Sequence, residues 1–517
     1  MKRSVSTSQT EDLYLSSAKN LKSTNANGNK KSRVESNIQD TTYAIVVSDK
    51  TLNMWGSVVL ALSEKYNKAP IFNYEETVAE TKSKLQTCGC CLRHVAFVAH
   101  WSECGEKFVR SIHRLTRSID GRSPFSDVIW GIITGYDESE ALKMVTETNK
   151  PLTIQHVVSG SVEGVDLRAF QSGVAFNELV QRHSVEKAEV ANLLGTGGDD
   201  VWLNQDSTLL IANAIEDSRT NMIITSGHAR ESEWNIGYGF PGGQFRPSPN
   251  GSMHAFPLGQ SIGPDAIPVD TNTTVKDIST HTQSSREICS STTVKVYSAA
   301  GNCLMGHINS QHCMALAWMK SCGVRQMFGY TVSTWYGFAG WGVHRYLWAN
   351  VGDLTFSQAY FANQQALQLG LMQANEEATK TSTNGRKSQR RLQGLMFDSD
   401  ATVFFGDPAW EARMVPKWRQ YDITCDISTD KIRNEMTITC TVKTLTSGCW
   451  TPTCPDDKTT LPGRPPFMLL EAGYSASNQL PTHVSSELVI TPLFILIPLS
   501  GEFSAEEVYV RKVVMHL

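Results

Sequence analysis

The sequence predicts an α/β fold with a mostly parallel sheet flanked by helices, followed by a C-terminal β-sandwich. Apolar runs of strand length alternate with helical patterns from residue 43 to about 405, as in sheets whose strands are joined by crossover helices. After about residue 415 short β-rich runs between Pro and Gly turns replace this alternation, which is typical of a small sandwich. The 517 residues exceed what one hydrophobic core holds, so several domains are expected.

The expected elements follow from the spacing of apolar residues. Strands buried on both faces read as continuous apolar runs, whereas helices carry apolar residues three or four apart. The expected strands of the α/β part are 43–47, 94–99, 128–133, 222–225, 294–297, 324–332 and 401–405. The expected helices are 54–66, 138–148, 208–215, 312–321 and 355–373. The expected sandwich strands are 421–427, 436–442, 467–470, 488–499 and 508–514.

Changes in composition divide the chain into four expected units. Residues 1–40 are rich in Ser, Asn, Lys and Thr, so they bury too little apolar surface to offset ordering and are expected to be a disordered tail. An N-terminal α/β subdomain is expected over 41–182, a catalytic subdomain over 183–415 and an Ig-like β-sandwich over 416–517. Residues 258–290 read as a loop inserted between two strands, and residues 374–391 as a mobile polar connection.

Charge and hydropathy exclude several classes of partner. The formal net charge of −4 gives no electrostatic case for binding nucleic acid or an anionic membrane. No apolar run reaches the roughly 18 residues of a membrane span, and the N-terminus shows no signal peptide. Twelve cysteines without such a signal indicate free thiols in a reducing compartment. We therefore expect a cytoplasmic protein with neither a nucleic-acid nor a membrane partner.

Two reactive side chains follow consecutive apolar strands. His228 comes directly after Gly227 at the end of one strand, and Cys303 follows the next strand and its Gly301 turn. Ligands and chemistry collect outside the carboxyl ends of parallel strands, so the two side chains face one cleft if their strands are neighbours. An imidazole there supplies both the base and the positive charge that a thiolate needs. The glycines of these turns would let backbone amides approach a substrate carbonyl and stabilise an oxyanion.

Two alternatives stay open at this point. A single buried cysteine is usually an inert small hydrophobe, and a single histidine at a strand end is usually structural. His307, four residues after Cys303, is a rival base that a helix beginning at Cys303 would place one turn away. Gly306 and Asn309 indicate a turn there instead, which favours His228.

Three segments resemble the gingipain-type cysteine peptidases. The segment Gly227-His228-Ala229-Arg230-Glu231-Ser232-Glu233-Trp234 is similar to their histidine motif, with Ala229 in place of a glycine. An alanine also offers its backbone N–H, so the resemblance implies that Ala229 is an oxyanion donor. The segment after Cys303, up to Trp335, is similar to the stretch after their nucleophile, and Phe405-Gly406-Asp407-Pro408 is similar to the Gly-Asp-Pro that closes their catalytic domain. The resemblance implies a caspase-like fold with a following sandwich, and hydrolysis of peptide bonds through a Cys303 thioester with His228 as general base.

The remaining parts of the expected site are less sharply marked. Glu231 and Glu233 are local candidates for the acid that orients the imidazole, and Gly227 and Asn302 are expected to support the site or its oxyanion hole. Thr334, Trp335 and Tyr336 are expected to line the substrate pocket, with core packing as the equal alternative for the aromatic cluster that they form with Trp341.

No cofactor or metal is expected. The Cys88-Gly89-Cys90-Cys91 run has no second Cys/His pair at a zinc-site spacing, so free thiols are the better interpretation. The Gly195-Thr196-Gly197-Gly198 run lacks the Gly-Lys-Ser/Thr ending of a phosphate loop. The hypothesis is therefore a cysteine endopeptidase acting on a peptide or protein substrate. The alternative is a catalytically inactive binding or scaffold protein with the same fold.

Overall fold

The computed structural model describes residues 41–74, 78–119, 124–126, 128–159, 208–236, 243–257, 285–289, 293–334, 337–380, 385–416, 419–430, 432–450, 463–470, 482–485 and 487–516. The expected tail, residues 1–40, lies outside these ranges. So do Gly195–Gly198 and most of the expected insertion at 258–290.

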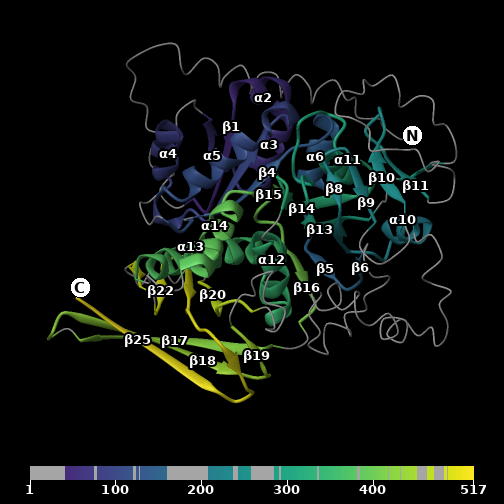
Figure 1. Ribbon diagram of the computed structural model, residues 1–517. Helices are drawn as coiled ribbons and strands as arrows, with labels where there is room; N and C mark the ends of the chain where they lie inside the picture. The colour runs from purple at the N-terminus through teal and green to yellow at the C-terminus, as the bar shows by residue number, and fades with distance from the viewer. Residues whose placement is uncertain are drawn as a thin grey trace, which may run out of the picture.

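A nine-stranded sheet organises the α/β part, in the order β2-β1-β3-β4-β15-β14-β13-β7-β6 (Figure 1). Its strands are β1 (Tyr43–Val47), β2 (Ile71–Asn73), β3 (His94–Val98), β4 (Ile129–Ile133), β6 (Val157–Ser159), β7 (Met222–Gly227), β13 (Lys295–Asn302), β14 (Val324–Tyr330) and β15 (Thr402–Gly406). Neighbours pair in parallel except β14 and β15, which are antiparallel. The expected mostly parallel sheet is therefore confirmed.

β15 joins the strands of the two expected subdomains, because it pairs with β14 on one side and with β4 on the other. Asp407 follows β15 and is fully buried. Its carboxylate accepts hydrogen bonds from the hydroxyls of Tyr43 (2.9 Å) and Tyr66 (2.6 Å) and pairs with Lys65 at 2.8 Å. Strands from 41–182 and from 183–415 thus form one sheet, and the boundary between these subdomains stays a prediction.

Helices flank this sheet. They are α2 (Asp49–Met54), α3 (Gly56–Lys65), α4 (Val78–Gln86), α5 (Glu106–Thr116), α6 (Glu138–Thr146), α10 (Thr208–Glu216), α11 (Met314–Ser321), α12 (Phe338–Ala349), α13 (Phe356–Lys380) and α14 (Gly385–Asp398). Polar side chains fix several helix starts: the Ser48 hydroxyl accepts from the Thr51 N–H, and the Asp137 carboxylate accepts from the Glu140 N–H. The expected helices are all present, with shifted ends.

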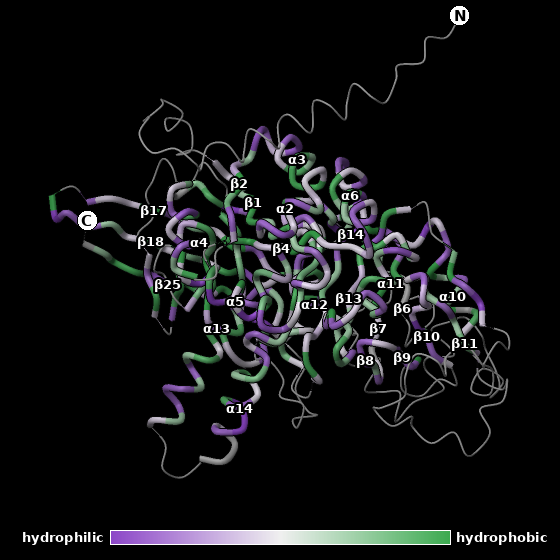
Figure 2. The backbone as a smooth tube through the Cα atoms, turned by 90° about the horizontal axis from the view of Figure 1, so that it is seen from above, coloured by the Kyte–Doolittle hydropathy of each residue, from purple (hydrophilic) through white to green (hydrophobic). Residues whose placement is uncertain are grey.

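The expected mobile connection at 374–391 is wrong. α13 continues to Lys380 and α14 begins at Gly385, so most of this segment is helical. The segment is polar because this hairpin projects from the body of the molecule (Figure 2). Leu395 still packs between the two helices near Gly370, and Glu377 pairs with Arg391 at 3.1 Å.

A small antiparallel sheet follows β7. It contains β8 (Ala229–Arg230), β9 (Glu233–Asn235), β10 (Gln244–Pro247), β11 (Met253–Phe256) and β12 (Arg286–Glu287). The fully buried Trp234 ring stacks on Phe245 at 4.9 Å and also meets Trp318 of α11. The sequence did not predict this sheet, because strands of two to four residues carry no readable alternation.

The C-terminal part is made of antiparallel sheets, as expected (Figure 1). One sheet has the order β17-β18-β25 and another the order β20-β23-β22-β21, and β19 pairs with β24. Their bounds are β17 (Tyr421–Asp430), β18 (Glu435–Thr444), β19 (Gly448–Cys449), β20 (Phe467–Leu469), β21 (His483–Val484), β22 (Val489–Ile490), β23 (Phe494–Leu496), β24 (Glu502–Phe503) and β25 (Val508–His516). Buried residues of both larger sheets, such as Ile438 and Ile495, share one apolar cluster.

Two further elements tie the parts together. β16 (Ala412–Met414) pairs in parallel with β5 (Leu152–Ile154) beside the large sheet.

Among the described residues, none of the helices combines the length and apolar character that crossing a membrane requires.

Candidate active site

The strands that precede His228 and Cys303 are neighbours in the large sheet. β7 and β13 pair in parallel, and Gly227 lies opposite Asn302 at their carboxyl ends. His228 and Cys303 are each the next residue along the chain. The two side chains therefore leave the same edge of the sheet from adjacent strands, which is the arrangement that the sequence hypothesis needs.

Both strand ends turn through unusual backbone conformations. Gly227 has φ +135°, which only glycine adopts readily, and Leu304, directly after Cys303, has φ +56°. The pairing of β13 with β7 also shifts between Ser298 and Gly301. Left-handed non-glycine residues and strand irregularities are concentrated at functional sites. The two turns therefore support the carboxyl ends of β7 and β13 as a candidate functional site.

Cys303 is half-buried, and its thiol donates to the Thr334 carbonyl at 3.7 Å. The chain after it adds to the end of β14, because the Leu304 N–H donates to the Val332 carbonyl and the Gly306 N–H to the Tyr330 carbonyl. The approach is close: a Cβ on Gly306 would stand 2.7 Å from the Gly329 oxygen. The turn carrying Cys303 is thus held by backbone contacts on the β14 side.

His228 is exposed and begins the short β8–β9 hairpin. Its carbonyl accepts from the Asn235 N–H at 2.8 Å, and Ala229 lies opposite Trp234. In an antiparallel ladder this bond makes the Ala229–Trp234 pair the non-hydrogen-bonded kind. The Ala229 N–H is therefore not used by the hairpin, which leaves it available as the expected oxyanion donor.

The two candidate acids differ in their contacts. Glu231 joins the histidine hairpin to the cysteine segment, since its carboxylate accepts from the Asn309 amide at 3.1 Å and its carbonyl from the Met314 N–H at 2.7 Å. Glu233 instead pairs with Arg246 of β10 at 3.1 Å. Of the two, Glu231 is the one that contacts the segment following the nucleophile.

Asn302 is fully buried beneath this edge. Its side-chain oxygen accepts from the Thr225 hydroxyl at 2.5 Å, and its amide donates to the Gly227 carbonyl at 3.2 Å. These contacts suit a supporting residue better than an oxyanion donor. Thr225 was not predicted as a site residue, and the signal for it was a hydroxyl facing inward within an apolar strand.

The rival base His307 has a defined tautomer. Its Nδ1 lies 3.0 Å from the Thr331 carbonyl oxygen, which only accepts, so Nδ1 carries the proton and Nε2 keeps a lone pair. His307 is half-buried. It remains chemically competent as a base, and a variant must decide between it and His228.

The expected pocket wall is described in part. Thr334 contacts Cys303 through its carbonyl as above, whereas Trp335 and Tyr336 lie outside the described residues. Gly337 has φ +79° where the chain enters α12, and Trp341 packs edge-on against the His344 ring at 5.9 Å. Trp341 thus packs within α12.

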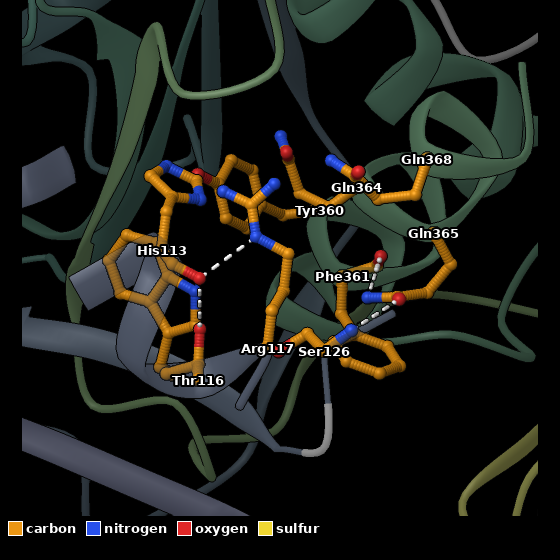
Figure 3. Close-up of a pocket in the computed structure, with 10 residues that line it drawn as sticks. His113, Thr116, Arg117, Ser126, Tyr360, Phe361, Gln364, Gln365 and Gln368 are labelled. Carbon is orange, nitrogen blue, oxygen red and sulfur yellow. Dashed lines mark hydrogen bonds between the residues drawn. The ribbon is translucent and has the colours of Figure 1, made fainter. Parts of the chain in front are cut away.

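A separate cavity lies between α5, β4 and α13 (Figure 3). The polar side chains of Arg117, Gln364, Gln365 and Gln368 line it together with the rings of Trp130 and Tyr360. Its volume of about 10 Å³ suffices for roughly one water molecule. None of the predicted site residues lines it, so it does not serve as the substrate pocket.

The cysteine-rich run near residue 90 forms a short helical turn, Gly89–Cys91. Burial raises the pKa of the Cys88 thiol to about 11, which disfavours the thiolate form that metals bind. Within the part of the chain that the structure describes, no three His, Cys, Asp or Glu side chains gather as metal ligands.

Comparisons with known proteins add one similarity. No family model and no curated protein matches the chain. Among solved structures, the chain is similar to the complex of Porphyromonas gingivalis RgpB pro- and mature domains, with 12% sequence identity and a TM-score of 0.39, over 91% of this chain and 99% of that chain. A similarity of this size assigns no activity and no residue, so the case for the site rests on its own geometry.

Proposed function

We propose that this protein is a cysteine peptidase in which Cys303 is the nucleophile and His228 the general base. One observation carries the proposal: Gly227 and Asn302 lie opposite each other at the ends of adjacent parallel strands. The residues that follow them are a histidine and a cysteine. A nucleophile and its base need to lie within hydrogen-bond reach, and neighbouring strand ends about 4.8 Å apart bring two side chains into that range.

The reaction follows from these roles. The His228 imidazole takes the proton from the Cys303 thiol, and the thiolate attacks the carbonyl carbon of a peptide bond. The backbone N–H groups of Ala229 and Cys303 stabilise the oxyanion. The imidazolium then protonates the leaving amine. Water, deprotonated by the same imidazole, hydrolyses the thioester and restores the thiol. Glu231 holds the histidine hairpin against the segment after Cys303.

The first test is selective alkylation of the full-length protein at about neutral pH. Cys303 should react with iodoacetamide faster than the other thiols, because a nearby imidazole raises its thiolate fraction. His228→Ala should slow the labelling of Cys303 by about 100-fold if the imidazole acts as its base. His307→Ala is the matched comparison and should leave that rate within about twofold.

The labelling of a second cysteine, Cys289, is the control for thiol accessibility. Cys289 is exposed and precedes β13, whereas Cys303 follows the carboxyl end of that strand, so its labelling should be the same in both histidine variants. Turnover is then measured on a library of fluorogenic peptides with wild type and Cys303→Ala. Cleavage that survives Cys303→Ala, or labelling of Cys303 that depends on His307 and not on His228, would overturn the assignment.

A second function, a binding or scaffold protein without turnover, is favoured by one contact. The Cys303 sulfur contacts the Thr334 carbonyl oxygen at 3.7 Å, so the thiol has a structural partner other than a base. If Cys303 labels at the rate of an ordinary thiol and His228→Ala changes nothing, the protein keeps this fold without the reaction.

A further inference from the structure

We infer that Tyr297, Thr225 and Asn302 form a positioning chain that sets the distance between the two catalytic turns. This inference rests on the proposed function, because it concerns the same pair of strand ends. All three side chains are fully buried and none reaches the substrate side of the sheet edge. They act through His228 and Cys303, not on a substrate.

The direction of each hydrogen bond in this chain is fixed. The Thr225 hydroxyl has one proton, which goes to the Asn302 side-chain oxygen at 2.5 Å. The Tyr297 hydroxyl, 2.7 Å from the same Thr225 oxygen, is therefore the donor of the second bond. The Asn302 amide donates the third bond to the Gly227 carbonyl at 3.2 Å. Thr225 and Asn302 each accept at one side and donate at the other, so the bonds strengthen one another.

The positioning chain of hydrogen-bonded side chains connects β13 to β7 directly beneath both catalytic residues. Asn302 precedes Cys303 and Gly227 precedes His228, so the last bond joins the residues next to the nucleophile and the base. It lies above the shift in register between Ser298 and Gly301, where the ladder itself is irregular. A side-chain link therefore maintains the spacing at the point where the backbone ladder is interrupted.

Packing holds Tyr297, the first residue of the positioning chain. The Tyr297 ring stacks on Trp318 of α11 at 4.1 Å between centroids. α11 begins at Met314, whose N–H donates to the Glu231 carbonyl in the histidine hairpin. The strand ends are thus tied together from below by the hydroxyl chain and from the side through α11.

The test replaces the central hydroxyl and follows Cys303 alkylation as a function of pH. Thr225→Val is nearly isosteric and removes the link between Tyr297 and Asn302. The expected result is a fall of about tenfold in the labelling rate of Cys303 at neutral pH, because small displacements in a catalytic pair are costly. The pH profile of this labelling rate should also change, because the thiol and its base are no longer held together.

Three further variants separate positioning from general damage. Thr225→Ser keeps the hydroxyl and should restore most of the rate, whereas Tyr297→Phe should give a smaller loss because the Asn302 link remains. Thr134→Val is the matched control. Thr134 is a buried threonine just beyond β4 whose hydroxyl contacts the Cys104 thiol at 3.6 Å, and its replacement should leave Cys303 unchanged.

The outcomes distinguish this inference from the proposed function. Slow labelling in His228→Ala together with wild-type labelling in a folded Thr225→Val protein would overturn the positioning chain and keep the dyad. Unchanged labelling in His228→Ala would overturn the dyad and the positioning chain with it. Circular dichroism and thermal unfolding of each variant show that the folded protein is compared throughout.

An independent observation in the C-terminal part carries a second inference. We propose that Cys425 and Cys440 form a reversible disulfide across β17 and β18. The two residues are directly opposite in register, and their sulfur atoms are 3.8 Å apart. Cys425 is half-buried, so one sulfur is open to attack. Directly opposed strand residues have Cβ atoms about 4.5–5.5 Å apart, slightly beyond the disulfide range, so a small closure suffices.

The oxidant is a small disulfide such as oxidised glutathione. The Cys425 thiolate attacks one of its sulfurs and releases one thiol, and Cys440 then attacks the mixed disulfide and releases the second thiol. The test incubates the full chain with oxidised glutathione, blocks the remaining thiols and sequences cross-linked peptides. A Cys425–Cys440 cross-link, lost in Cys425→Ser, is expected. Glutathione adducts on the exposed Cys289 with none of this cross-link would overturn the proposal.

Discussion

Neutralising one buried carboxylate should stabilise this protein fully above about pH 6, by about half near pH 5, and not at all below the ordinary carboxyl pKa of 3.8. Asp398 ends α14 and is fully buried. Its carboxylate accepts from the Ala339 N–H at 2.8 Å and lies 3.4 Å from the Tyr330 hydroxyl. Burial raises the pKa of Asp398 to about 6, despite these donors and the nearby Arg464. The ionised carboxylate of Asp398 therefore lowers the free energy of unfolding.

The size and sign of the effect follow from linkage. A shift from 3.8 to about 6 corresponds to about 3 kcal/mol, since each pKa unit is about 1.4 kcal/mol. Below the unfolded pKa both states are protonated and there is no cost. As the pH rises from 3.8 to about 6, the folded protein loses stability up to this amount. Asp398→Asn keeps an oxygen for the Ala339 N–H, so it should gain about 2–3 kcal/mol near pH 7.5 and about half of that near pH 5.

Urea unfolding followed by tryptophan fluorescence at the two pH values measures this difference. Asp400→Asn is the control, because Asp400 is ion-paired with Arg117. Burial alone would raise the pKa of Asp400, but His113 and Arg117 lower it below its usual value. Its stabilising effect is present at both pH values, so Asp400→Asn should destabilise equally at each. A loss of stability in Asp398→Asn near pH 7.5, or a gain independent of pH, would refute the reasoning.

Three other predictions follow from buried groups. Burial raises the pKa of Cys104 to about 12 and that of Cys88 to about 11. Both thiols should therefore react with iodoacetamide far more slowly than Cys289 in the native protein, and at a rate similar to Cys289 in urea, as measured by mass spectrometry. Gly306→Ala should cost about 1–3 kcal/mol in a urea titration because its Cβ would meet backbone, whereas Gly370→Ala in α13, with 3.5 Å of room, should be neutral or stabilising. Asp407→Ala should cost about 3–5 kcal/mol in the same titration, because it leaves Lys65 without its carboxylate.

The sequence predicted the large sheet because its strands are buried on both faces. β1, β3 and β4 are apolar along nearly their whole length, and such runs allow few other interpretations when helical patterns separate them. α14 was missed because its apolar residues, Leu392 and Leu395 among them, are embedded in a basic, polar segment. α12 was missed because an aromatic and glycine-rich segment gives no clear helical period.

The sequence predicted that His228 and Cys303 follow strand ends, because the end of an apolar run marks the end of a buried strand. Their adjacency could not be read from the sequence, since which strands pair is a property of the whole sheet. The contacts that refine the site are also long-range: the Thr334 carbonyl reaches Cys303 only because the segment after β13 adds to the end of β14. Backbone carbonyls carry no sequence signature, so contacts of this kind become visible only in the structure.

The C-terminal part affects the candidate site through one helix, α12. Figure 1 shows α12 and α13 between the large sheet and the C-terminal sheets. Arg464, buried in this contact, donates to the Asn363 side chain at 2.9 Å and to the Phe338 carbonyl at 3.0 Å, and its guanidinium lies over the Phe338 ring. Phe338 begins α12, and Gly340 in the same turn lies so close to β13 that a Cβ would stand 2.2 Å from the Ala300 carbonyl oxygen. The C-terminal part therefore fixes the start of the helix that follows Thr334, which is a supporting contact beside the candidate site.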